Sequence, residues 1–264
     1  MADGELIIRQ GYTELETEIG GKPLVFIPPI IGPGGYVDIK ERIEKALLNF
    51  PTAAETVSLV YAARKDNFSN YAKEILERLN GGLLTSTVCH YFPNKGVYIQ
   101  DNPRVENRKI IRNENELVLK SEEKNLGVRF VPFRFKVGEQ NARDLVRNSF
   151  VIGLVGEEGA ERLSEIAGDF GYPSVSSFNN VDEPLTMPSA LCIEGLDCKS
   201  WFVVNGKFNY MNGSAFGIRS QKFLDYMKRL KAEKISRELK RSLDDSFKII
   251  EEAEAILRGE KPRV

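Results

Sequence analysis

The chain has 264 residues, of which 42% are hydrophobic and 28% are charged. These shares are typical of a globular protein and exclude a disordered chain. The 37 basic and 38 acidic residues give a net charge of -1, so no overall field gathers nucleic acid or an anionic membrane. Nucleic acid or an anionic membrane would therefore have to bind to a local patch of basic residues.

The cysteines and the N-terminal residues favour a protein of the reducing cytoplasm. Cys89, Cys192 and Cys198 are odd in number and lack CxxC spacing, which argues against a secreted disulfide scaffold and a structural zinc site. Asp3 and Glu5 stand where a signal peptide would be basic. No apolar run reaches the roughly 20 residues of a membrane span, so we expect a cytoplasmic protein without a membrane partner.

The first 79 residues predict a hairpin followed by helices. Alternating apolar and polar residues up to Ile19, then two glycines and a second apolar run, are typical of a β-hairpin. The prolines within 28–33 lack amide hydrogens, so that segment is expected to be a loop. Apolar residues recur at helical spacing within 38–79, which predicts three helices.

The pattern from residue 83 to residue 137 indicates mainly strands. Alternation on both sides of a Pro-Asn-Lys-Gly turn predicts a second hairpin over 83–100. Residues 101–127 are polar, and we expect a surface segment with weak strands, one of them at 117–119. A proline interrupts the next apolar run, 128–137, which predicts a strand at the edge of a sheet.

Residues 150–175 have the pattern of a β-α-β unit. The apolar run 150–155 predicts a buried strand, 157–168 a helix, and the following residues a second strand. Glycines at three-residue spacing fall where the first strand would pass into the helix, which is where open α/β sheets bind their ligands. These glycines are Gly153, Gly156 and Gly159.

Acidic residues at this predicted turn suggest a binding pocket. Glu157 and Glu158 stand where a phosphate would lie, and the chain lacks both the Walker lysine and the full dinucleotide fingerprint. Under one interpretation the glutamates only stabilise the helix start. Under the other they join the loop 179–183 in an acidic pocket for a small molecule or a divalent cation. The candidate ligand-binding residues are Gly153, Gly156, Glu157, Glu158, Asn179, Asn180, Asp182 and Glu183.

No residue pattern identifies a reaction, a catalytic residue or a cofactor. His90 is the one histidine, on a predicted strand whose alternation places Cys89 and Tyr91 on the opposite face. We therefore interpret His90 as a structural residue and expect no multi-histidine metal site within one chain. The cysteines are interpreted as buried thiols.

The C-terminal segment predicts one long amphipathic helix. Residues 220–258 lack glycine and proline, and as a helix they would extend on the order of 55 Å. Residues 220–243 carry eight basic and three acidic residues, a net charge of +5, whereas residues 244–257 carry one and five, a net charge of -4. A nearly continuous apolar stripe is expected, formed by Phe223, Met227, Leu230, Leu239, Leu243, Phe247, Ile250, Glu254 and Leu257.

Three interpretations of this helix remain open. It could lie solvated across its own domain, or it could pack antiparallel against a second copy, which would neutralise the two halves and make a homo-oligomer. Its basic half could also contact nucleic acid, but the acidic half argues against that partner.

The sequence as a whole predicts an α/β or α+β fold. We expect a mixed sheet with hairpins and one β-α-β unit, covered by helices, in a domain of residues 1–219, followed by a helical segment of residues 220–264. The first functional hypothesis is a protein, enzyme or not, that binds a small molecule or cation in the acidic pocket. The alternative is an assembly protein that self-associates through its C-terminal helix.

Overall fold

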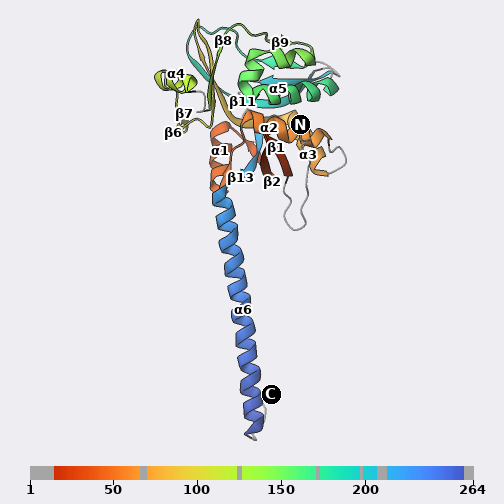
Figure 1. The fold of residues 1–264 in the computed structure, drawn as a ribbon, viewed down its shortest axis with the longest axis vertical. Helices are drawn as coiled ribbons and strands as arrows, with labels where there is room; N and C mark the ends of the chain where they lie inside the picture. Colours follow the sequence, from red (N-terminus) through yellow and green to blue (C-terminus); the bar gives the residue numbers. More distant parts are fainter. Residues whose placement is uncertain are drawn as a thin grey trace. The chain divides into compact units, whose positions relative to one another are not determined.

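The computed structural model describes residues 15–65, 70–123, 127–170, 173–196, 199–206 and 213–258 (Figure 1). The chain divides into two compact units, Met1–Arg219 and Ser220–Val264. The described residues of the first unit form a mixed sheet with helices packed on it, and those of the second form one long helix. The predicted mixed-sheet fold is confirmed, and its class is α+β.

Helices and strands alternate irregularly along the described chain. The helices are α1 (Tyr36–Lys45), α2 (Ala53–Lys65), α3 (Asn70–Arg78), α4 (Glu114–Glu122), α5 (Ser149–Phe170) and α6 (Gln221–Leu257), with 3₁₀ turns η1 (Leu79–Gly81) and η2 (Ala142–Arg147). The strands are β1 (Leu15–Ile19), β2 (Lys22–Gly34), β3 (Leu48–Asn49), β4 (Leu83–Phe92), β5 (Gly96–Asp101), β6 (Val105–Glu106), β7 (Lys109–Ile110), β8 (Val128–Pro132), β9 (Gly138–Glu139), β10 (Ser174–Ser176), β11 (Leu185–Leu196), β12 (Lys199–Asn205) and β13 (Gly213–Arg219).

One sheet organises the first unit. Its main strand order is β1-β2-β13-β4-β11-β12-β10-β9, with β3 beside β13, and β5 pairing with both β4 and β8. Most neighbours are antiparallel, and the parallel pairs are β10 with β12 and β13 with β4. The strand β4 is buried along its whole length, because the sheet continues on both sides of it.

Both predicted hairpins form. The strands β1 and β2 pair with Ile19 opposite Lys22, around a turn in which Gly20 and Gly21 have positive φ angles. The strands β4 and β5 pair with Phe92 opposite Gly96. Strand β8 pairs with β5 alone, so the prediction of an edge strand is confirmed. Residues 5–14 of the first predicted hairpin lie outside the described residues.

Two predictions about the first 130 residues are wrong. The proline segment 28–33 belongs to strand β2, which pairs with β13 through a register that shifts between Gly213 and Ala215 and between Ala215 and Gly217. Such irregularities accommodate prolines, because not every amide of the strand has to donate to the ladder. The run 117–119 lies in helix α4, which begins after the cap residue Asn113; the Asn113 side chain accepts a hydrogen bond from the Glu116 amide at 3.3 Å.

The predicted strand 150–155 is also wrong, because these residues form the first turns of α5. The Asn148 side chain accepts a hydrogen bond from the Phe150 amide at 3.1 Å, which caps the helix and satisfies one of its free amides. An apolar run of six residues fits a buried strand and a buried helix equally well. The second strand of the predicted unit does form, as β10.

The three glycines that suggested a ligand turn have structural roles in α5. A Cβ atom on Gly153 would lie 2.5 Å from Val131 Cγ2 and 3.0 Å from Ile99 Cδ1, so the missing side chain lets α5 approach strands β8 and β5 closely. Gly156 has a φ angle of 76°, a left-handed conformation that kinks the helix. A Cβ atom on Gly159 would lie 2.8 Å from Val155 Cβ, which also disfavours any larger residue there.

The prediction that His90 is a structural residue is confirmed. Its ring is buried and lies 3.0 Å from the Thr186 hydroxyl and 3.1 Å from Gln100 Oε1. Because that oxygen of Gln100 can only accept, Nε2 donates to it and Nδ1 accepts from Thr186, as in a neutral imidazole. Burial lowers the pKa of His90 to about 4, against the hydrogen bond to Gln100, which raises it.

Helix α6 is continuous from Gln221 to Leu257 (Figure 1). The Ser220 hydroxyl accepts a hydrogen bond from the Phe223 amide at 3.1 Å and caps the helix start. The helix continues through Ser242, whose carbonyl accepts a hydrogen bond from the Ser246 hydroxyl. No helix among the described residues combines the length and the apolar character needed to span a bilayer.

We predict that Gly153→Ala destabilises the first unit. The new methyl group would overpack against Val131 and Ile99, at a cost of about 1–3 kcal/mol that exceeds the gain of about 1 kcal/mol in helix propensity. The matched control is Gly168→Ala in the same helix, where a Cβ atom would meet nothing within 4 Å. Urea unfolding followed by circular dichroism measures both, and equal stabilisation by the two substitutions would contradict the packing of α5.

We also predict that the protein loses stability as the pH falls from 7 to 5, partly through His90. The pKa of His90 is about 6.5 in the unfolded chain and about 4 in the folded chain. Between these values the unfolded chain binds a proton that the folded chain does not, so lowering the pH favours unfolding. The expected contribution is a loss of about 2 kcal/mol in the free energy of unfolding. In His90→Gln the difference between the two pH values should shrink by that amount. An unchanged difference would show that His90 titrates normally.

Candidate functional site

The eight residues predicted to bind a ligand lie on α5 and in the loop before β11. Gly153 is buried against the sheet, and Gly156 forms the kink of α5. Glu157 is exposed one residue later. The four residues of the loop are also exposed, namely Asn179, Asn180, Asp182 and Glu183.

Glu158 has structural partners at both of its carboxylate oxygens. One oxygen accepts a hydrogen bond from Arg162 at 2.6 Å and the other from the Gly20 amide at 2.9 Å. Arg162 is 7% exposed, and its guanidinium also donates to the Glu18 carbonyl and the Ser58 hydroxyl, both at 2.6 Å. Glu158 therefore neutralises a buried arginine that joins α5 to the first hairpin and to α2, and breaking a pair of this kind is costly.

Toward the C-terminus of α5, residues on the same face contact α2. Glu165 accepts a hydrogen bond from the Tyr61 hydroxyl at 2.9 Å. Asp169 pairs with Arg64 through both of its oxygens, and the hydrogen bonds from Arg64 lower the pKa of Asp169. Glu158, Glu165 and Asp169 are thus used for packing two helices together.

The acidic residues of the predicted pocket are not gathered into a cluster. Among the described residues, no group of three or more His, Cys, Asp or Glu side chains is placed to hold a metal ion. The premise of the predicted site, a turn from a strand into a helix, is wrong because α5 is helical on both sides of Gly156. Binding of a small molecule or cation by these eight residues stays a prediction.

A cavity of about 490 Å³ lies elsewhere, between α1 and the segment 102–108. Asn102, Asn107 and Arg108 have left-handed φ angles of 51°, 49° and 60° there. Left-handed backbone is uncommon outside glycine and often marks functional loops. The asparagines of this segment were the only signal in the sequence that could have indicated this cavity.

The charges around this cavity are already paired with one another. Arg108 contacts Asp38 at 2.5 Å and Glu41 at 3.8 Å. Lys40 contacts Glu44 at 2.8 Å, and Arg104 pairs with Glu106. With every lining cation matched by a carboxylate, the cavity selects neither an anion nor a cation, and we assign it no ligand.

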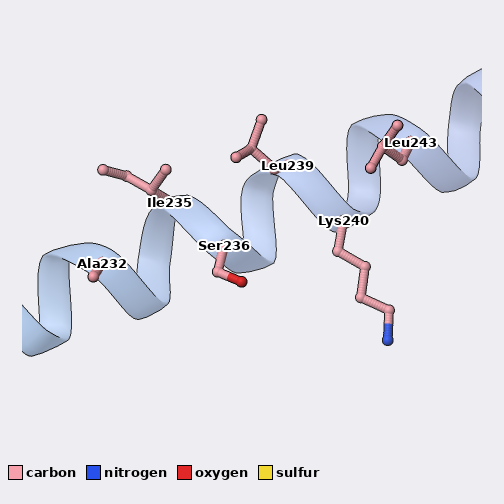
Figure 2. A pocket seen from close by; sticks show the side chains of 6 residues that line it. All are labelled: Ala232, Ile235, Ser236, Leu239, Lys240 and Leu243. Atoms are coloured by element: carbon pink, nitrogen blue, oxygen red, sulfur yellow. The ribbon is translucent and has the colours of Figure 1, made fainter.

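Helix α6 exposes large apolar side chains, and most of those in its second half lie along one face. We define the distal stripe as Ile235, Leu239, Leu243, Phe247 and Ile250, whose exposed fractions range from 47% to 61%. Figure 2 shows Ile235, Leu239 and Leu243 projecting to the same side of the helix, while the side chain of Lys240 extends to the other. Exposed apolar residues that are contiguous in this way are typical of an interaction surface.

The apolar residues of α6 form two stripes, so the prediction of a single one is wrong. A helix turns by about 100° per residue, so the nine residues from Leu230 to Leu239 rotate the chain by about two and a half turns. Phe223, Met227 and Leu230 therefore lie on the face opposite the distal stripe. Ile235 belongs to the distal stripe although it is not one of the residues of the predicted stripe. The side chains of Glu254 and Leu257 lie outside those described.

The cysteines have no redox arrangement in the described part of the chain. Cys89 and Cys192 are buried and form no disulfide, as predicted, and Cys198 lies outside the described residues. Burial raises the pKa of Cys89 to about 12, which keeps it a neutral thiol.

Comparisons with known proteins identify a fold and no family. No protein-family model matches the chain, and no curated protein matches it either. A solved structure described as "Accommodation of massive sequence variation in Nanoarchaeota by the C-type lectin fold" matches with a TM-score of 0.51 and 15% sequence identity, covering 76% of this chain and 100% of that one. At this identity the similarity shows the fold alone: the chain resembles a protein with a C-type lectin fold.

Proposed function

We propose that the chain is an assembly protein that self-associates through the distal stripe of α6. The observation that supports this proposal is the exposure of five large apolar side chains on one face of a helix of 37 residues. A helix of that length with a stripe at spacings of three and four residues gains stability when the stripe is covered by another helix.

The size of the stripe indicates an association of moderate strength. Covering a fully exposed side chain of this kind contributes about 1.5–3 kcal/mol, and these side chains are about half exposed. Ten of them in a pair of helices would contribute on the order of 10 kcal/mol. Association costs about 4–15 kcal/mol in lost freedom of motion. The difference is at most about 6 kcal/mol, which corresponds to a dimer that forms at tens of micromolar and dissociates on dilution.

The charges of α6 favour a second copy of this chain as the occupant of the stripe. The half with a net charge of +5 and the half with a net charge of -4 are complementary to each other. A partner with one sign of charge would match only one half. No comparable complementarity supports a ligand at the cavity beside α1 or at the predicted acidic pocket.

We predict that Leu239→Ser with Leu243→Ser converts a dimer into a monomer. Both side chains lie at the centre of the distal stripe, and their removal takes away four of the ten apolar contacts in a pair. Size-exclusion chromatography with light scattering on the full chain at tens of micromolar measures the molar mass, and circular dichroism checks that the helix persists.

The matched control is Tyr226→Ser with Leu230→Ser. These side chains are also large, apolar and exposed on α6, but they lie on the opposite face, so the dimer should persist. A wild-type chain that is monomeric at these concentrations would contradict the proposed function. Equal loss of the dimer in both double variants would contradict the distal stripe as its site.

A further inference from the structure

We infer that the two copies of α6 pack antiparallel, with Leu243 of one copy opposite Leu243 of the other. This inference rests on the proposed self-association and adds the direction, the register and the arrangement of the pair. It starts from two properties of the helix that are independent of each other, the spacing of the apolar side chains and the order of the charges.

The spacing of the distal stripe is nearly symmetric about Leu243. Leu239 and Phe247 lie four residues to either side of it, and Ile235 and Ile250 lie eight and seven residues away. When a second helix runs in the opposite direction with the two Leu243 residues level, Leu239 faces Phe247 and Ile235 faces Ile250. Every level of the seam is then filled by an apolar pair, which is the condition for a continuous interhelical core.

The order of the charges along the helix gives the direction of the pair. In the antiparallel pair, the half of one helix with a net charge of +5 lies along the half of the other with a net charge of -4, so the two attract each other. In a parallel pair in register, each half lies along its own copy, and halves of like charge repel each other.

These charges set the direction more than the strength of binding. They lie outside the apolar seam on exposed side chains, where single pairs contribute little and salt screens them over about 8 Å. The charges of a whole half nevertheless act in the same direction, which is how charge patterns select one helix orientation over another.

The antiparallel arrangement predicts the distance between equivalent residues of the two copies. Lys222 lies 21 residues before Leu243, so at 1.5 Å per residue the two Lys222 positions are about 63 Å apart along the axis. In a parallel pair the same positions are separated only by the spacing of two helices, about 10 Å. Arg241, two residues from the midpoint, stays close to its copy in both arrangements.

The experiment measures spin-label distances in full-length dimers that carry one label per chain. The labelled variants are Lys222→Cys and, as the matched control, Arg241→Cys, each with Cys198→Ser so that the remaining cysteines are the buried Cys89 and Cys192. Both labelled positions are exposed and lie outside the distal stripe. Light scattering on the same samples establishes that they are dimers.

The expected result is a distance of about 60 Å or more at residue 222 and a distance below about 35 Å at residue 241. Short distances at both positions in a proven dimer would overturn the antiparallel inference and leave the proposed self-association standing. A monomer in light scattering would overturn both. Long distances at both positions would show that the pair is not centred on Leu243, which would also overturn the inference.

Discussion

Burial of apolar surface is the constraint on which this structure depends, and the two units meet it differently. In the first unit the mixed sheet and its helices enclose a continuous core that includes Leu83, Tyr91, Phe150 and Leu163. In the second unit the described residues form one helix, and no other described residue of that unit covers its apolar face. A single helix cannot bury its own stripe, which is the reason for proposing that a second copy covers it.

The parts of the fold that the sequence predicted are those set by local patterns. The hairpins follow from alternation and glycine turns, and α6 follows from 37 residues without a helix breaker. The segment 150–155 could not be assigned by its pattern, because a short apolar run does not distinguish a strand from a helix. Asn148 was the available signal: an asparagine two residues before that run is a typical helix cap.

The candidate site shows that a local sequence pattern does not reveal contacts between distant segments of the chain. Glu158 looked available for a ligand although one partner, Arg162, lies one turn along the same helix; its other partner, the Gly20 amide, is 138 residues away in the chain and comes close only in the fold. The three regularly spaced glycines suggested a phosphate turn, whereas close packing and one kink account for them. The reversal of the apolar face within α6 was, by contrast, contained in the sequence, because the nine residues between Leu230 and Leu239 determine it.

Self-association of the chain is the central claim, and sedimentation equilibrium of the full-length protein tests it most directly. One chain has a mass of 29.8 kDa, so the account predicts an average mass that rises with concentration toward about 60 kDa over the micromolar range. A mass that stays at that of one chain up to the highest concentration reached would contradict it, because the distal stripe would then remain exposed without a second copy.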